Sequence, residues 1–297
     1  MYLVIPEGAV ATHTGSTAAG IAINHASPVL QDCRVISNSA TVQEVPSDGM
    51  SGWANPLSAG IACLEGKPLI QNCTIASNTI EMSEMSEPDA DTLVPEAVIA
   101  GGLAVMGAVQ GEILTTDHCT LQGNSVHLNL TAAPVGNITH LAVAGGMALI
   151  NHQDSGVLVE ASYPGFSENS VTIAGLAGYA GKLTVGGGSS WVGEACVSVN
   201  PVYHGNWVDL PAGLNCPYTA AGGIAAHGGG VYPSLGEFSE NRVSATPITL
   251  PKSLGMCLAA GAMAGTEAFL EPENCAFMAN QISATPITLP TPPPPFA

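Results

Sequence analysis

The chain has 297 residues, of which 46% are hydrophobic and 9% are charged, and 23 acidic against 5 basic residues give a formal net charge of -18. This length allows one large domain with a sizeable core. The acidic balance argues against a nucleic-acid-binding protein, which needs a basic surface, and against binding to an anionic membrane. The longest apolar runs, at 141–150 and 255–265, are shorter than the roughly 18–20 residues of a membrane-spanning helix.

An eight-residue phrase with an Asn at its sixth position recurs along the whole chain. Its first copies are "CRVISNSA" (33–40), "CTIASNTI" (73–80) and "CTLQGNSV" (119–126). In chain order the Asn residues are Asn38, Asn78, Asn124, Asn169, Asn206, Asn241 and Asn280. Three positions before them stand the apolar or aromatic residues Val35, Ile75, Leu121, Phe166, Tyr203, Phe238 and Phe277. The Asn residues are 35–46 positions apart, so the chain consists of seven copies of a unit of about 40 residues.

A second phrase, built around Gly and an aliphatic residue, lies between successive copies of the first. In chain order it reads "AAGIAI" (18–23), "SAGIAC" (58–63), "AGGLAV" (100–105), "AGGMAL" (144–149), "AGKLTV" (180–185), "AGGIAA" (221–226) and "AAGAMA" (259–264). In both phrases apolar residues alternate with small or polar ones, which is the period of a β-strand. Short strands that recur in register predict a parallel β-solenoid.

We expect each phrase to form one strand of its own coil. Each repeat then makes two coils, and roughly 13–14 coils at about 4.8 Å give a rod about 60–65 Å long. The residue three positions before each Asn points inward. The Asn itself lies at a corner, because its side chain tolerates the left-handed conformation and bonds nearby backbone.

The two phrases resemble the repeats of chlamydial polymorphic outer-membrane proteins. "AGGIAA", "AGGMAL", "FSENSV" (166–171) and "FSENRV" (238–243) carry the resemblance, which covers about residues 18–284. It implies an extracellular, right-handed parallel β-helix of the adhesin or passenger type. The predicted fold is therefore all-β, a right-handed parallel β-helix of about seven two-coil repeats.

The predicted β-helix domain spans 1–284 and carries loop insertions near 42–58, 81–97 and 203–219. The second insertion holds six carboxylates within 81–96, which suits cation or partner binding, or a solvated acidic loop. It lacks the Asp-x-Asp-x-Asp-Gly pattern of a calcium loop. The Pro-rich segment 285–297 predicts a stiff tail or linker.

Four cysteines share one repeat position, five residues before the Asn. If adjacent copies are two coils apart, roughly 9–10 Å, these cysteines lie beyond disulfide reach. The other spacings leave three candidate disulfides, Cys196–Cys216 first, then Cys63–Cys73 and Cys257–Cys275. No Cys-x-x-Cys motif occurs, so we expect no zinc site and no cofactor. The four at the shared position are Cys33, Cys73, Cys119 and Cys275.

Two further sets of residues are candidate contact or modification sites. Three Asn-x-Ser/Thr motifs are candidate glycosylation sites, at Asn72, Asn129 and Asn137. In the Gly phrase, Ala alternates with larger residues, and if the larger ones point inward the Ala column points outward. Either the chain's own loops cover this column or it is a lateral contact between molecules. Its members are Ala22, Ala62, Ala104, Ala148 and Ala225.

Catalysis is the minority interpretation. Polysaccharide-cleaving β-helices need clustered carboxylates, or carboxylates with calcium and a Lys or Arg base, and here the seven Asp residues do not recur at strand positions. We therefore expect a non-enzymatic, extracellular or cell-surface protein, a structural or adhesive rod in a layer, appendage or filament. Its expected partners are further copies of itself, other surface-assembly proteins or glycans, without nucleic acid and without membrane insertion. The alternative is a carbohydrate-binding or polysaccharide-cleaving β-helix.

Overall fold

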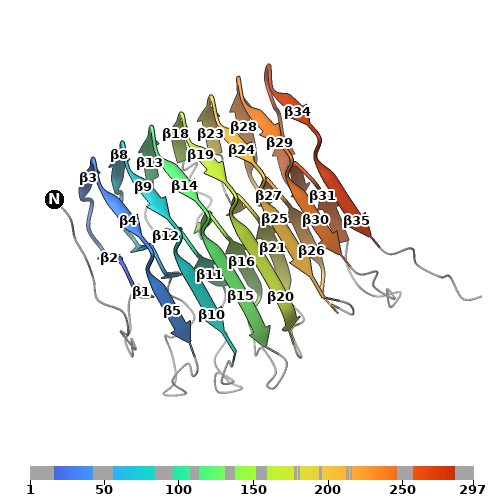
Figure 1. Cartoon of the computed structure of the whole chain (residues 1–297), viewed down its shortest axis with the longest axis horizontal. Helices are drawn as coiled ribbons and strands as arrows, with labels where there is room; N and C mark the ends of the chain where they lie inside the picture. Colours follow the sequence, from blue (N-terminus) through green and yellow to red (C-terminus); the bar gives the residue numbers. More distant parts are fainter. Residues whose placement is uncertain are drawn as a thin grey trace, which may run out of the picture.

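A computed structural model describes residues 17–42, 56–83, 96–107, 114–130, 138–151, 159–176, 179, 181–193, 196–211, 214, 216–245 and 257–284. The secondary structure of these residues consists of β-strands, numbered β1 to β35 (Figure 1). Neighbouring strands run parallel, and the described strands form five sheets of seven strands each. The predicted all-β, parallel β-helix fold is confirmed. In the part of the chain that the structure describes, no helix could cross a membrane.

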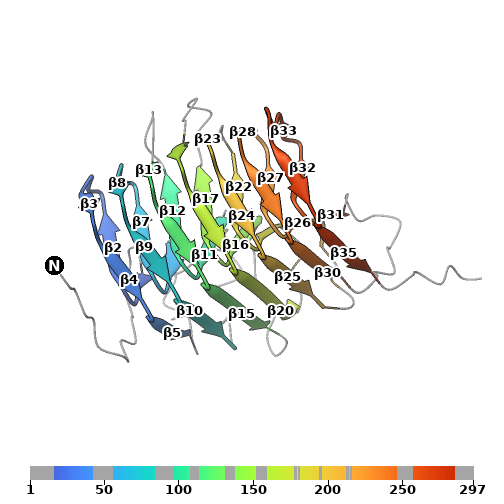
Figure 2. The same ribbon diagram turned by 45° about the horizontal axis from the view of Figure 1, so that its top comes forward.

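Each sheet takes one strand from every repeat. Sheet A contains β1 (Thr17–Ala18), β6 (Pro56–Ser58), β11 (Glu96–Ala100), β16 (His140–Ala144), β21 (Lys182–Gly186), β26 (Tyr218–Ala221) and β31 (Cys257–Ala260). Sheet B contains β2 (Ile21–Asn24), β7 (Ile61–Leu64), β12 (Leu103–Gly107), β17 (Met147–Asn151), β22 (Ser189–Val192), β27 (Ile224–His227) and β32 (Met263–Thr266). Strands of sheet B lie side by side in Figure 2.

The remaining three sheets follow in the same order around each coil. Sheet C contains β3 (Val29–Gln31), β8 (Leu69–Gln71), β13 (Leu114–Asp117), β18 (Val159–Ser162), β23 (Cys196–Val199), β28 (Gly230–Ser234) and β33 (Phe269–Leu270). Sheet D contains β4 (Arg34–Ile36), β9 (Thr74–Ala76), β14 (Thr120–Gln122), β19 (Gly165–Ser167), β24 (Val202–His204), β29 (Glu237–Ser239) and β34 (Ala276–Met278). Sheet E contains β5 (Ser39–Val42), β10 (Thr79–Met82), β15 (Ser125–Leu130), β20 (Ser170–Leu176), β25 (Trp207–Leu210), β30 (Arg242–Ala245) and β35 (Gln281–Ala284).

The expectation of two coils per repeat is wrong. Ile75 pairs with Val35 on one side and with Leu121 on the other, so strand neighbours are one whole repeat apart. Each repeat is a single coil of five strands, and we number the coils 1 (β1–β5) to 7 (β31–β35). Both phrases belong to the same coil, since the Gly phrase turns from sheet A into sheet B and the Asn phrase turns from sheet D into sheet E. The predicted copy "AGKLTV" (180–185) is misaligned, because it ends inside β21, and Gly187 and Gly188 form the corner between sheets A and B in that repeat. Six intervals of about 4.8 Å make the stack about 29 Å long, half the expected length.

Left-handed residues mark the corners of each coil. At the corner between sheets D and E the residue with positive φ precedes the Asn, so the expected left-handed Asn is also wrong. Short polar residues or Gly hold this position in most coils, in keeping with the steric cost of a Cβ there. The set is Ser37, Ser77, Gly123, Glu168, Gly205, Glu240 and Ala279.

The buried apolar residues form three main clusters that divide the coil into compartments. One cluster lies between sheets A and E and includes Ile99, Val126 and Val143. A second fills the space among sheets B, C and D and includes Leu103 and Leu121. The third lies on the other face of sheets A and B, where those two sheets pack against each other. Sheets A and B are therefore covered on both faces along the middle coils.

Candidate functional site

The seven Asn residues of the repeat lie in one row at the corner between sheets D and E and form a hydrogen-bonded ladder. Asn169 is fully buried. Its Oδ1 accepts from the Asn124 backbone N–H at 3.1 Å and from Asn124 Nδ2 at 3.0 Å. Its Nδ2 donates to the Leu121 carbonyl oxygen at 2.8 Å and to Asn206 Oδ1 at 3.0 Å. Because the same bonds recur from coil to coil, the ladder joins the coils along the whole stack.

Beside the ladder, the inward residues of sheet D end in a column of stacked aromatic rings. Ring centroids are 4.5 Å apart for Phe166 and Tyr203, 5.0 Å for Tyr203 and Phe238, and 5.0 Å for Phe238 and Phe277. The Tyr203 hydroxyl lies 3.0 Å from Ser189 Oγ, and burial raises the pKa of this phenol. The column is a packing element with one satisfied polar atom.

Replacing Phe238 by Ala should lower the free energy of unfolding by about 3–5 kcal/mol, because this ring is fully buried between two others. Phe277 lies at the end of the column and is 47% exposed, so Phe277→Ala should cost only about 1–2 kcal/mol. Urea unfolding of both variants measures the difference. Equal losses would mean that the column is not packed as described.

The predicted outward Ala column is not a surface. Ala62, Ala104, Ala148 and Ala225 are 0% exposed, and only Ala22, on coil 1, is exposed. Alternate residues of sheet B pack against the face of sheet A that points away from sheet E. The lateral contact between molecules is therefore contradicted at the four buried positions. Sheet A packs on this column, and Ala is needed because the two sheets converge where the Gly phrase turns.

Sheets A and B pack against each other along a contact that we call the A/B seam. A polar cluster lies at one edge of this seam, where the strands of sheet A begin and the strands of sheet B end. Lys182 Nζ lies 3.0 Å from His227 Nε2 and 3.3 Å from Glu267 Oε2. The imidazole ring of His140 lies 4.6 Å from that of His227, and His140 Nε2 lies 2.9 Å from Thr184 Oγ1. This cluster was not predicted from the sequence, although alignment on the repeat places His140 and Lys182 at paired positions of neighbouring strands.

The environment of this cluster holds His140 in its neutral form. Burial first, then the neighbouring His227 and Lys182, lowers the pKa of His140 to about 3. Burial and Lys182 also lower the pKa of His227, while Glu267 opposes that shift. Neutral imidazoles beside one lysine suit a structural contact, in which protonation would introduce unfavourable charge.

Acidification should therefore weaken the fold through His140. In the unfolded chain the His140 imidazole has a pKa near 6.5, whereas in the folded chain its pKa is about 3. The contribution of neutral His140 to the free energy of unfolding is therefore fully present above pH 6.5 and is lost as the pH falls toward 3. Between pH 6.5 and 4.5 the loss from this residue should be about 2 kcal/mol. Urea unfolding across this range measures the slope, which His140→Gln should flatten. His118→Gln is the control, because the His118 side chain is 55% exposed; an equal effect of both changes would contradict the prediction.

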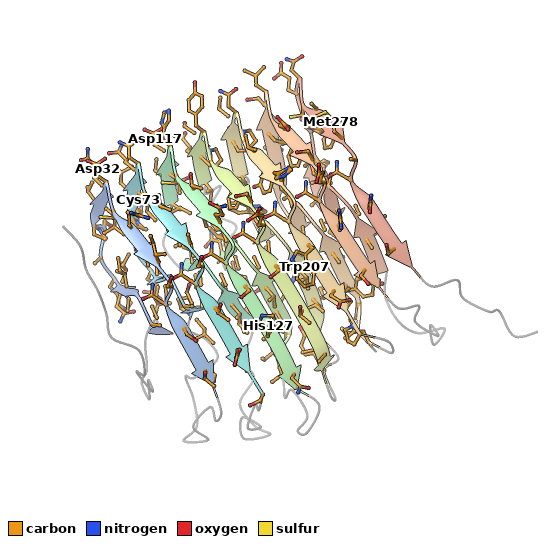
Figure 3. The ribbon with its side chains drawn as sticks, viewed as in Figure 1. Asp32, Cys73, Asp117, His127, Trp207 and Met278 are labelled. Carbon is orange, nitrogen blue, oxygen red and sulfur yellow. The ribbon has the colours of Figure 1, made fainter. Side chains whose placement is uncertain are left out.

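A shallow depression of about 400 Å³ lies on the outer side of the corner between sheets D and E. Trp207, 40% exposed and labelled in Figure 3, lines it together with Glu240 and Arg242. Ser244 and Ser283 add hydroxyl groups from the next two coils. The prediction that Trp207 belongs to a loop insertion, 203–219, is wrong. Trp207 begins β25, which follows β24 directly after the corner between sheets D and E, and β26 begins at Tyr218. Positions 212, 213 and 215, between β25 and β26, lie outside the described residues.

The cysteines do not form the candidate disulfides. Among the cysteines whose side chains are described, every one is a thiol, and Cys257 lies outside that set. Cys196 and Cys216 lie in different core clusters, which excludes their predicted pairing. Cys63 and Cys73 are buried thiols of one cluster. Burial raises the pKa of Cys73 to about 11.

The row of Cys33, Cys73, Cys119 and Cys275 contains no disulfide, but the distance argument for this was wrong. Cys33 and Cys73 lie on adjacent coils, and the Cys33 backbone N–H donates to Cys73 Sγ at 3.4 Å. Cys119 follows on the next coil, and Cys275 lies on coil 7. A thiol in this row also donates to a carbonyl oxygen, as Cys119 Sγ does to Ile70 O at 3.2 Å. Cys73 and Cys119 act as small buried side chains of the core, whereas Cys33 and Cys275, on the first and last coils, are partly exposed.

Two of the three candidate glycosylation sites lie on described residues, far apart in the coil. Asn72 is exposed at the corner between sheets C and D, with φ of 50°, and Asn129 is exposed on β15. Asn137, most of the insertions near 42–58 and 81–97, and the tail 285–297 lie outside the described residues.

Within the described part of the chain, no group of three or more His, Cys, Asp or Glu side chains is placed to hold a metal ion. The Asn ladder and the A/B seam use their polar groups to join coils, whereas the cluster at Lys182 and the depression at Trp207 place polar groups at the surface. Comparison with protein-family models, with curated protein sequences and with solved structures found no match to this chain.

Proposed function

We propose that this chain is a non-enzymatic structural or adhesive rod that acts outside the cell or at its surface. The observation that carries the proposal is the buried Asn ladder, which runs from Asn38 to Asn280 through all seven coils. A ladder of this kind ties each coil to the next and makes the stack rigid, which suits a spacer or a building block. The resemblance of its repeats to those of chlamydial polymorphic outer-membrane proteins supports an extracellular location.

Electron microscopy of intact producing cells with an antibody against this chain tests the proposal. Label on an ordered layer, appendage or filament is the expected result. Label confined to the interior of the cells would contradict it. In parallel, purified protein is incubated with a panel of acidic and neutral polysaccharides, and no new reducing ends or unsaturated sugars should form. Turnover of any of them would replace the structural role by an enzymatic one.

A second candidate function is carbohydrate binding at the depression around Trp207. An exposed indole offers a flat apolar face for a sugar ring, and Arg242, Glu240 and Ser244 surround it with donors and acceptors. Isothermal titration calorimetry with soluble oligosaccharides tests this candidate, because its signal does not depend on the indole that the variant removes. Trp207→Ala should abolish binding, whereas Tyr163→Ala, which removes an aromatic side chain 51% exposed outside the depression, should leave it unchanged. Binding that survives Trp207→Ala would exclude this site.

A further inference from the structure

The last coil ends the stack with an open apolar face. Phe277 and Ile282 are 47% and 52% exposed, whereas the same positions of coil 6, Phe238 and Val243, are 0% and 1% exposed. Met278, labelled in Figure 3, is 48% exposed on the same strand as Phe277. The exposed ends of two inward columns indicate that coil 7 presents a surface of the kind that every other coil buries.

The Asn ladder has a direction, and its two ends are complementary. In each step the backbone N–H and Nδ2 of one Asn donate to Oδ1 of the Asn in the following coil. At coil 7, the backbone N–H and Nδ2 of Asn280 face the position where an eighth Asn would offer its Oδ1. At coil 1, Asn38 Oδ1 occupies the accepting position of the row. Donors thus end one face of the stack and an acceptor ends the other.

The backbone edges match in the same way. Ile224 N–H donates to Ala262 O in coil 7, and Met263 occupies the position of Ile224 one coil later. In the first pair of coils the Ile21 N–H donates to Gly60 O, so the residues before Ile21, Ile61 and Met263, which are Gly20, Gly60 and Ala262, occupy one row. In a second copy placed beyond coil 7, the carbonyl group that would accept from the Met263 N–H is therefore that of Gly20. Every strand of coil 7 is the last of its sheet. Unpaired strand edges of this kind are templates for β-strand addition.

Polar side chains at the two ends are also complementary. Within one chain, His25 Nδ1 of coil 1 lies 2.8 Å from Glu65 Oε2, its neighbour in the same row of coil 2. Glu267 occupies this row on coil 7 and is 66% exposed at its side chain. Continuing the row beyond coil 7 places a second copy's His25 beside Glu267, an arrangement that the chain already makes once.

We propose that a second copy of this chain docks its coil 1 on coil 7 of the first, so that the Asn ladder, the strands of sheets D and E beside it and the backbone row of Gly20 continue across the junction. The inference rests on the proposed structural function and names its partner. Coil 1 is the less open end, since Ile23 and Val35 are 5% and 7% exposed, so its contribution is chiefly strand edges and Asn38. Repeated head-to-tail docking makes an open filament.

A disulfide between two native cysteines can detect this junction in the unsubstituted chain. In the docked pair, Cys275 of one copy and Cys33 of the next occupy adjacent places in one row, about 4.8 Å apart along the stack, within the Cα range of a disulfide. Both side chains are partly exposed. Diamide takes two electrons and two protons from a pair of thiols, which forms the disulfide and the reduced hydrazine. Within one copy these cysteines are six intervals apart, about 29 Å, so a Cys33–Cys275 link must join two copies.

Peptide mapping of the diamide-treated full chain at high concentration is the deciding experiment. A Cys33 peptide linked to a Cys275 peptide, with dimers and longer oligomers on a non-reducing gel, is the expected result. Links only between Cys33 and Cys73 of one copy, or a Cys275–Cys275 link, would overturn head-to-tail docking.

Sedimentation equilibrium adds a matched pair of variants. Phe277→Asp should weaken self-association at least tenfold, whereas Val202→Asp, at a residue 43% exposed on the side of the same sheet, should leave it unchanged. Circular dichroism confirms that both variants are folded. A monomer at every concentration would overturn docking and leave the surface location of the rod intact. Assembly by a chain that is found inside cells or that cleaves polysaccharides would instead remove the proposed function and leave docking intact.

Discussion

Replacing Asn169 by Ala should lower the free energy of unfolding by about 2–6 kcal/mol. The change removes the Oδ1 that accepts from the Asn124 backbone N–H and from Asn124 Nδ2. The buried N–H is left without an acceptor, and Nδ2, which still donates to the Ile75 carbonyl oxygen, loses the acceptor of its second hydrogen. Each such orphaned group costs about 1–3 kcal/mol. Urea unfolding followed by circular dichroism measures the loss.

Asn38→Ala is the matched control, because Asn38 is the first member of the same ladder and is only partly buried. It donates to Asn78 Oδ1 through its Nδ2 at 2.7 Å, and Asn78 Oδ1 keeps the Asn38 backbone N–H as a donor after the change. The variant should therefore lose about 1 kcal/mol or less. A loss at Asn169 no larger than at Asn38 would show that the ladder does not join the coils as described.

Replacing Ala148 by Glu should lower the free energy of unfolding by about 4 kcal/mol or more and leave little folded protein. Ala148 is fully buried in the A/B seam, between Ala104 and Ser190 of the neighbouring coils. A longer side chain overpacks the seam by about 1–3 kcal/mol, and a carboxylate there has no partner, which costs several kcal/mol more. The soluble yield and the midpoint of thermal unfolding measure this.

Ala22→Glu is the control for the seam. Ala22 holds the same row of sheet B on coil 1, where it is exposed, so its replacement should change stability by less than about 0.5 kcal/mol. A folded Ala148→Glu protein as stable as Ala22→Glu would mean that sheets A and B do not close on each other.

The Gly phrase, at the corner between sheets A and B, lies close to the Asn ladder, at the corner between sheets D and E. A Cβ built on Gly146 would overlap the Gly188 carbonyl oxygen and lie 3.3 Å from Asn169 Nδ2. The Gly phrase therefore passes directly over the Asn phrase of its own coil. This close approach explains why the chain repeats both phrases together, and why the two core clusters on either side of it are separate.

Much of the fold follows from local pattern. The alternation in "AGGMAL" and "FSENSV" specifies strands, since successive side chains of a strand point to opposite faces. Recurrence of Asn169 and Phe166 at one place in every repeat specifies that they stack, because in a solenoid equivalent positions lie above one another. The row of Asn residues and the inward position of Phe166, Tyr203 and Phe238 therefore follow from the repeat alone.

Three features depend on the closed shape of the coil. The number of coils per repeat is decided by sheet C, whose short strands, such as Val29–Gln31, carry neither of the two recurring phrases. Ala148 is buried because sheet A packs against sheet B. The alternation of residues in the sequence cannot show this, since a strand with both faces buried has the same sequence pattern as a strand with small residues on an exposed face. The cluster of Lys182, His227 and Glu267 is assembled from coils 5, 6 and 7 by the packing of those sheets. The sequence by itself thus determined the repeat, its strands and its stacked columns, whereas only the tertiary structure decided which faces meet, since that depends on where each corner turns the chain.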